Sequence, residues 1–173
     1  KLDAGVRTGA SFAGERIPTL DETLAWAATQ PVRLCIEVKG DAVETYLRAG
    51  RATVELLQQR NALPRVTLTS FSPQCIAEMK ALEPLLAWGY DPDEHRAYTP
   101  WEVCAECLGC GANFLLYDHR RLTLDIVEEA HQHGFALWAW TADRPEDLRR
   151  LIGMNVDAIM TNRPDVLVEM LGA

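Results

Sequence analysis

The chain has 173 residues, 48% of them hydrophobic and 24% charged, which suits one soluble globular domain with a sizeable core. Its 25 acidic and 17 basic residues leave a net charge of −8. That balance excludes the basic surface needed for sequence-independent binding to nucleic acids or anionic membranes. No apolar run approaches the ~20 residues of a membrane-spanning helix. We therefore expect that the protein neither binds nucleic acid nor inserts stably into a membrane.

Helix and strand signals alternate through the first half of the chain. Thr19 with Glu22 three residues later is a capping-box pattern, which predicts the start of a helix. A strand over 33–39 follows and is closed by Gly40. The next predicted elements are a helix over 42–60, a strand over 66–71, a helix over 73–82 and a strand over 84–90.

The second half continues the alternation after a polar loop over 91–99. Thr99 suits a helix N-cap and Pro100 the first helical turn, so a helix should begin there. The remaining predicted strands are 113–118, 136–141 and 157–161, and the remaining helices are 122–133, Pro145 to near Asn155, and one from Pro164 onward.

Six strands, each followed by a helix, predict a parallel α/β fold, either an open doubly wound sheet or a (β/α)₈ TIM barrel. The strand over 33–39 favours the barrel. Arg33, Cys35, Glu37 and Lys39 share one face of this strand, whereas a doubly wound sheet needs two apolar faces. Ionisable groups at the C-terminal end of a strand suit the barrel mouth, where active sites lie. A closed eight-unit barrel needs two more βα units than the six that are predicted here.

The five cysteines form an odd and sparse set, unlike the dense, even sets of disulfide-stapled secreted domains. A reducing compartment, the cytoplasm, is therefore the expected location. Cys104, Cys107 and Cys110 are spaced as in some zinc or iron–sulfur sites. The same spacing places them on one stripe of a predicted helix, and no fourth ligand is evident nearby. We expect them to pack in the core.

Several short motifs occur together in a particular order along nearly the whole chain. They are Asp3-Ala-Gly5, Ile17-Pro-Thr-Leu20, Ile36-Glu-Val-Lys39, Ser70-Phe71, Trp140-Thr141 and Val156-Asp-Ala-Ile-Met-Thr161. In this order the chain resembles the glycerophosphodiester phosphodiesterases. The resemblance implies a TIM barrel that hydrolyses glycerophosphodiesters to sn-glycerol 3-phosphate and an alcohol. It also implies a divalent cation, Ca²⁺ or Mg²⁺.

The resemblance further implies motifs that should precede Asp3, namely His-Arg-Gly, Glu-x-Asp and His-Asp, and none of them occurs here. A typical barrel of about 250 residues leaves roughly 75 residues unaccounted for, which matches two strands and their histidines. Residues 1–173 are therefore expected to be one incomplete domain, the last six βα units of the barrel. The strands over 33–39 and 157–161 should then each have an unpaired edge.

Glu37 and Lys39 lie two residues apart on a strand, so their side chains point the same way. They can form a surface ion pair or meet one ligand. The resemblance implies that Glu37 is a metal ligand and that Lys39 binds phosphate and stabilises its developing charge during catalysis. It places Trp140 against the glycerol carbons, although this ring could instead fill the barrel. Phe71 is a further candidate for the pocket lining.

The four histidines match no catalytic histidine of the family. His131 and His133 should be solvated on a helix, and His95 and His119 should lie in surface loops. Two alternatives to the hydrolase stay open: a related phospholipase-type phosphodiesterase, and a non-catalytic barrel remnant that binds a ligand or partner. The remnant is favoured by the single glutamate, since one carboxylate should bind Ca²⁺ or Mg²⁺ poorly.

Overall fold

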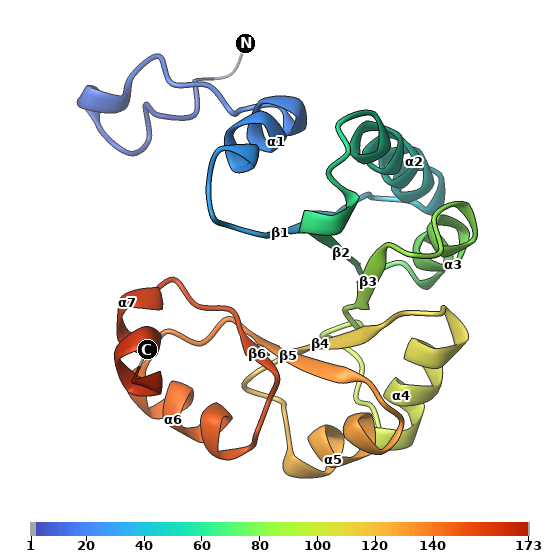
Figure 1. Ribbon diagram of the computed structural model, residues 1–173. Coiled ribbons are helices and arrows are strands. Elements are labelled where there is room, and N and C mark those ends of the chain that lie inside the picture. The colour runs from blue at the N-terminus through green and yellow to red at the C-terminus, as the bar shows by residue number, and fades with distance from the viewer. Residues whose placement is uncertain (1–2, 173) are drawn as a thin grey trace.

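The computed structural model describes residues 3–172, which form one curled parallel sheet with helices on its outer side (Figure 1). The strands are β1 (Leu34–Val38), β2 (Val66–Ser70), β3 (Ala87–Tyr90), β4 (Phe114–Asp118), β5 (Ala136–Trp140) and β6 (Ala158–Ile159). The helices are α1 (Leu20–Ala28), α2 (Val43–Gln59), α3 (Pro73–Leu82), α4 (Pro100–Gly109), α5 (Leu124–Gln132), α6 (Pro145–Gly153) and α7 (Pro164–Leu171). Short 3₁₀ turns occupy Ala10–Phe12 and Leu63–Arg65.

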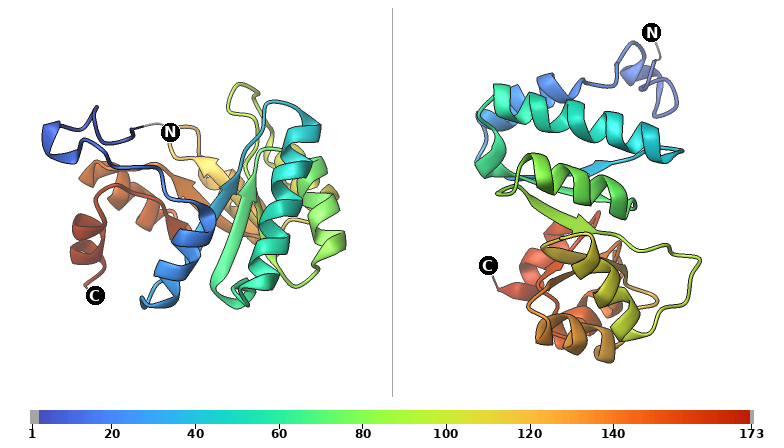
Figure 2. Two further views of the ribbon diagram at one scale, coloured as in Figure 1. Left: turned by 90° about the horizontal axis from the view of Figure 1, so that it is seen from above. Right: turned by 90° about the vertical axis from the view of Figure 1, so that its right-hand side faces the viewer.

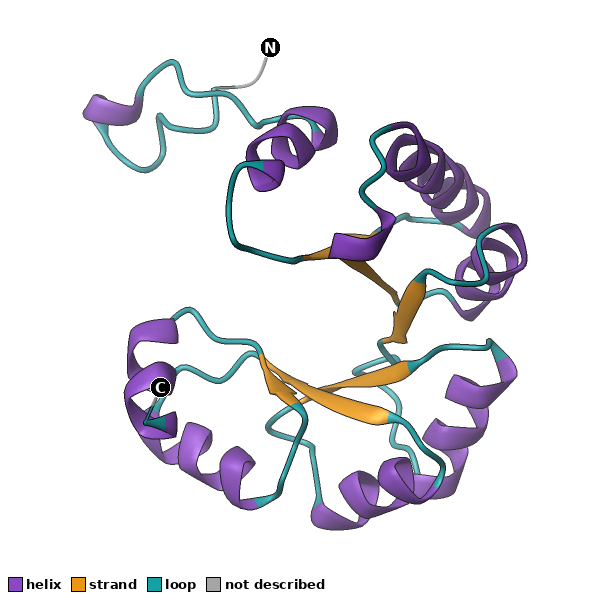
Figure 3. Cartoon of the chain, in the orientation of Figure 1, coloured by secondary structure: helices purple, strands orange, loops and turns teal. Residues whose placement is uncertain are grey.

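All strand pairs are parallel, and the strands lie side by side in chain order from β1 to β6. The helices cover the convex face, and the concave face is left open (Figures 2 and 3). Within the described residues β1 and β6 each pair on one side only, as expected. The prediction of parallel βα units is thus confirmed as a curled half-barrel, and the closed eight-unit barrel stays a prediction.

Local signals explain where the helices begin and end. Thr19 accepts a hydrogen bond from the Glu22 amide, and the Glu22 carboxylate accepts one from the Thr19 amide, so the predicted capping box is present. Thr99 and Glu102 form the same arrangement at the start of α4. The predicted end of a helix near Asn155 is confirmed: Asn155 follows α6 with φ of 58°, in the left-handed region that asparagine tolerates.

The two faces of the sheet carry different side chains. On the helix-covered face, Leu68, Trp88 and Leu137 are fully buried in the main apolar cluster. On the concave face, a Cβ on Gly89 would lie 2.3 Å from Phe114 Cε2 and 2.5 Å from Leu116 Cδ1. The missing side chain at Gly89 therefore makes room for its two neighbours from β4.

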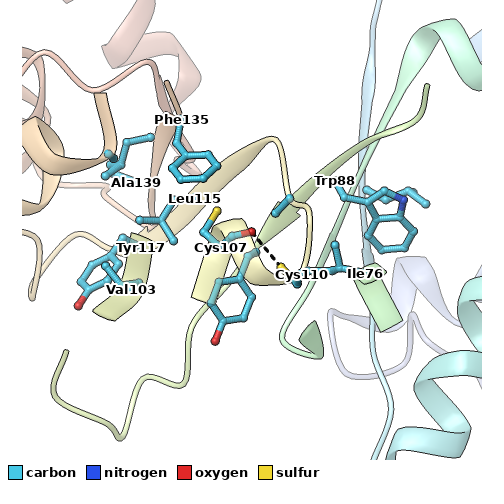
Figure 4. Packing of buried hydrophobic residues seen from close by; sticks show 14 of the residues in the cluster. Ile76, Trp88, Val103, Cys107, Cys110, Leu115, Tyr117, Phe135 and Ala139 are labelled. Atoms are coloured by element: carbon cyan, nitrogen blue, oxygen red, sulfur yellow. Dashed lines mark hydrogen bonds between the residues drawn. The ribbon is translucent and has the colours of Figure 1, made fainter. Parts of the chain in front are cut away.

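The cysteine stripe lies in the core, as predicted (Figure 4). Cys104, Cys107 and Cys110 are buried, and the Cys110 thiol donates a 3.3 Å hydrogen bond to the carbonyl oxygen of Cys107. Burial raises the pKa of the Cys104 thiol to about 11 and raises that of Cys107 as well. Protonated thiols in an apolar setting behave as small hydrophobic groups.

All six strands are shorter than predicted, four of them by one or two residues and β3 and β6 by three each. The strand expected over 84–90 begins only at Ala87, because the chain before it turns and leaves Leu85 94% exposed. The Lys80 ammonium stabilises this turn through the carbonyl oxygens of Pro84 and Leu86, at 2.8 and 3.1 Å. No periodicity in the sequence announces this contact between a side chain and the backbone.

The strand expected over 157–161 contains only Ala158–Ile159. Backbone hydrogen bonds from the Asp157 amide to Leu137 and from the Met160 amide to Ala139, at 2.9 and 2.8 Å, continue the pairing with β5 on both sides of it. Side chains add to this pairing: the Asp157 carboxylate accepts a 2.7 Å hydrogen bond from the Leu137 amide, and the Thr161 hydroxyl donates to Asp143 at 3.1 Å.

Candidate active site

A pocket of about 690 Å³ opens on the concave face at the C-terminal ends of the strands. Its lining comes from strands β1 to β5 or the residues directly after them, from the short β6 and the segment after it, and from α7. The lining residues are Cys35, Glu37, Lys39, Thr69, Phe71, Asp91, Leu116, Trp140, Thr141, Ile159, Met160, Thr161, Pro164, Leu167, Val168 and Leu171. All four predicted site residues, Glu37, Lys39, Phe71 and Trp140, are among them. Their functional roles stay predictions.

Glu37 and Lys39 project from β1 and its end into this pocket and form an ion pair, with Lys39 Nζ 3.1 Å from Glu37 Oε1. The two side chains are 37% and 68% exposed. Exposed pairs of this kind contribute at most about 1 kcal/mol to stability, so a ligand can separate them at low cost. The Lys39 ammonium also lies 5.6 Å from the centre of the Phe71 ring.

Asp91 is a pocket residue that the sequence reasoning missed by assigning it to a polar loop. It directly follows β3, and its amide donates a 3.1 Å hydrogen bond to the Ser70 carbonyl oxygen, which extends the ladder by one residue. Its side chain accepts a 3.1 Å hydrogen bond from Trp140 Nε1. The alternation of faces, continued two residues past Gly89, would have placed Asp91 on the concave side.

The electrostatic setting of Asp91 is unusual for a carboxylic acid. Burial raises the pKa of Asp91 to about 7, since the charged form has lost most of its hydration. The Trp140 hydrogen bond and the Lys39 charge act in the opposite direction, while Glu37 adds to the increase. Asp91 therefore titrates near neutral pH, whereas Asp118, at the end of the neighbouring strand β4, does not.

Asp118 ends β4 and is also buried, but a guanidinium partner compensates. Burial disfavours its charge, yet hydrogen bonds from Arg120 outweigh this effect and hold the pKa of Asp118 below its usual value. The Arg120 guanidinium lies 2.6 Å from the Asp118 carboxylate. Two buried aspartates at neighbouring strand ends thus have opposite electrostatic environments.

Carboxylate oxygens are the ligands that Ca²⁺ and Mg²⁺ prefer, and Glu37 and Asp91 both present them to this pocket. Within residues 3–172 no three His, Cys, Asp or Glu side chains lie close enough together to hold a metal ion. The donors present fit a hard divalent cation in kind, and within residues 3–172 the pocket lining supplies two carboxylates for it.

The histidines lie away from the pocket lining. His95 is exposed in the loop after β3, as expected. His119 was expected in a surface loop but is only 8% exposed: its amide bonds to the Trp140 carbonyl oxygen at 2.8 Å, and Arg150 packs against it. His131 and His133, expected to be solvated, are partly exposed and exposed, respectively, and they also bond to Asp157 at 2.9 Å and to Glu129 at 3.0 Å.

A smaller cavity of about 250 Å³ between α1, β1 and β2 is a poor candidate for chemistry. Its two cations are already engaged: the Arg60 guanidinium binds the Asp21 carboxylate, and Arg65 binds the carbonyl oxygens of Gln30 and Val32. These contacts tie α1 to the following elements. The cavity is therefore structural.

The fold and the pocket place the chain among α/β proteins with an active site at the C-terminal ends of parallel strands. A model of the Glycerophosphoryl diester phosphodiesterase family matches residues 1–166. The chain belongs to this family, which confirms the resemblance. A glycerophosphodiester phosphodiesterase from Caldanaerobacter subterraneus subsp. tengcongensis is 31% identical over 171 residues, 99% of this chain and 68% of the relative. One from Bacillus subtilis is 24% identical over 178 residues, 96% and 60% of the respective chains.

Solved structures agree on the architecture. A glycerophosphodiester phosphodiesterase from Parabacteroides distasonis superposes with a TM-score of 0.81 at 27% identity, over 92% of this chain and 66% of that one. A phosphodiesterase from Oleispira antarctica, solved in complex with its product sn-glycerol-3-phosphate, gives a TM-score of 0.85 at 22% identity, over 99% and 68%. The chain thus spans about two thirds of the proteins it matches. No helix in residues 3–172 is long and apolar enough to cross a membrane.

Proposed function

We propose that the protein hydrolyses glycerophosphodiesters to sn-glycerol 3-phosphate and an alcohol. The observation that carries this proposal is the family match over residues 1–166 together with the Glu37–Lys39 pair in the pocket. At the ends of parallel strands, an ammonium suits the negative charge of a phosphate diester, and a carboxylate suits the cation that accompanies it. The small-molecule diester is the proposed partner.

Each pocket residue has a role in this proposal. The Lys39 ammonium binds a phosphoryl oxygen and balances the negative charge that develops as the ester bond breaks. Glu37, once separated from Lys39, is a ligand of a divalent cation, Ca²⁺ or Mg²⁺. When bound, such a cation supplies positive charge that polarises the phosphoryl group. Trp140 and Phe71 form apolar walls on which the carbon atoms of the substrate pack.

The remaining parts of the machinery would lie outside this chain. The six units then belong to an eight-unit barrel, in which further strands pair with the free edges of β1 and β6. This extension is supported by the one-sided pairing of these strands and by the shares of 60% to 68% that the chain covers in its relatives. Additional cation ligands and the histidines for acid–base chemistry would come with those units.

A charge-removing variant tests the role of Glu37. In the whole protein, Glu37→Gln preserves shape but removes the anion, so we expect hydrolysis of glycerophosphocholine to fall about 100-fold or more at low metal concentration. High Ca²⁺ or Mg²⁺ should restore part of it. Glu55→Gln, an exposed position on α2, is the matched control and should behave as wild type. Unchanged rate and metal dependence in Glu37→Gln would contradict the ligand assignment.

A ligand-binding protein without catalysis is the second candidate, favoured by the fact that no histidine among residues 3–172 lines the pocket. Product binding separates the two functions. A whole protein that binds sn-glycerol 3-phosphate but turns over no diester, with saturating Ca²⁺ or Mg²⁺, would be the binding protein. Hydrolysis of intact phospholipids in preference to glycerophosphodiesters would instead indicate the phospholipase-type relative. The five free cysteines support a cytoplasmic location, whether the protein is the hydrolase or the phospholipase-type enzyme.

A further inference from the structure

Asp91 and Trp140 form a coupled pair in the wall of the pocket. Asp91 is only 6% exposed, and its Oδ1 accepts the indole N–H of Trp140 at 3.1 Å. Its other oxygen, Oδ2, has no hydrogen-bond partner in the described part of the chain, although Asp91 lines the same pocket as Glu37 and Lys39. This oxygen is not fully enclosed by the protein, so a ligand in the pocket can reach it and donate a hydrogen bond to it.

The backbone around Asp91 is held rigidly by contacts on the outer side of the sheet. The hydroxyl of Tyr90, the preceding residue, donates to Glu106 of α4 at 2.6 Å, and Glu106 also pairs with Arg96 from the loop that follows. The Arg121 guanidinium binds two carbonyl oxygens of that loop, those of Glu94 and Arg96. Asp91 is thus fixed before any ligand arrives, as a recognition group should be.

We propose that Asp91 recognises the glycerol part of the substrate: its Oδ2 binds one glycerol hydroxyl, while its Oδ1 holds the Trp140 ring against the glycerol carbons. The inference rests on the function proposed above and adds a specificity-determining residue to it. A hydroxyl donates to an ionised carboxylate and accepts from a protonated one, so the contact forms in either protonation state. A buried group built to bind a hydroxyl discriminates strongly against analogues that lack it.

Ligand binding tests the hydroxyl contact without requiring turnover. We would measure by calorimetry, on the whole protein, the affinities for sn-glycerol 3-phosphate, propane-1,3-diol monophosphate and propane-1,2-diol 1-phosphate, which each lack one hydroxyl. Wild type should bind one of the two analogues about 10- to 100-fold more weakly than sn-glycerol 3-phosphate, the range of a hydrogen bond to a charged group. Asp91→Ala should lose this preference. Asp93→Ala, an exposed position on the same loop, should keep it.

Nuclear magnetic resonance tests the positioning of Trp140 independently of any ligand. With ¹⁵N-labelled tryptophan, the Trp140 indole signal is assigned as the one that Trp140→Phe removes. Asp91→Ala should move this signal upfield, because the hydrogen bond is lost, and Asp93→Ala should not. Asp91→Asn retains an oxygen acceptor, so the signal should stay near its wild-type position. If Asp91→Ala fails to fold, a displaced Trp140 signal in Asp91→Asn would contradict the acceptor role of Asp91.

The outcomes separate this inference from the proposed function. If Asp91→Ala weakens all three ligands equally, or leaves the Trp140 indole signal in place, the role of Asp91 is overturned while the function stands. If wild type binds none of the three phosphates, both are overturned. If the Asp91 variants bind glycerol 3-phosphate as tightly as wild type does, Asp91 makes no contact with the glycerol hydroxyls.

Discussion

The burial of Asp91 should make the stability of the protein fall as pH rises towards neutral. The pKa of this group is about 7 in the folded protein against an ordinary value of 3.8, with burial as the main cause. Between these two values the folded state holds the proton and the unfolded state has released it. Stability from this group is therefore fully present below about pH 3.8, declines as pH rises, and is lost once pH passes about 7.

The magnitude follows from the size of the shift. A difference of about three units corresponds to about 4 kcal/mol, of which about 2 kcal/mol falls between pH 5 and pH 7. Asp91→Asn stays neutral at every pH and keeps an oxygen that can accept the Trp140 N–H. Its free energy of unfolding, relative to wild type, should rise by up to about 3 kcal/mol from pH 5 to pH 8.

Urea unfolding of the whole protein in the presence of a chelator is the assay, and Asp118→Asn is the matched control. The pKa of Asp118 is lowered, so its stabilising contribution is lost only as pH falls below the ordinary value of 3.8. The cost of Asp118→Asn should accordingly be the same at pH 5 and pH 8. A constant difference for Asp91→Asn over that range would refute the reasoning about its burial.

Two predictions concern packing. Gly89→Ala should lower the free energy of unfolding by about 1–3 kcal/mol, because its Cβ would overlap Phe114 and Leu116. Gly153→Ala is the control: its Cβ would meet no atom within 4 Å, so thermal unfolding should show no loss of stability. Cys107→Ala should cost about 1–2 kcal/mol as a small core truncation. Elemental analysis of wild type should find no stoichiometric zinc or iron; one zinc per chain, lost in Cys107→Ala, would contradict the structural role.

The sequence predicted those features that depend on local rules. The capping box at Thr19 and the N-cap at Thr99 follow from neighbouring residues alone, and both are present. The alternation along 33–39 placed Glu37 and Lys39 on one face, and both line the pocket. Short-range periodicity is sufficient for such features because each side chain's direction depends on the backbone of its own element.

Features that depend on contacts between distant segments were missed. His119 looked like a loop residue, but α6, some thirty residues further along the chain, covers it through Arg150. The start of β3 depends on Asn113, which precedes β4 and whose side-chain oxygen accepts hydrogen bonds from the Trp88 amide and from the Lys80 ammonium. Asp91 stood among charged loop residues, and only the fold shows that it extends the ladder and faces Trp140.

Asp91 itself shows why a buried acid at this position is better explained by a ligand than by the fold. Its structural contact, the hydrogen bond from Trp140, needs only an oxygen acceptor, which an asparagine would provide without the penalty of burying a charge. Close to neutral pH the aspartate costs stability that such a neutral side chain would retain. Groups that are costly to the fold are expected where recognition or chemistry requires them. The place of Asp91 beside Glu37 and Lys39 therefore supports a role in binding the substrate.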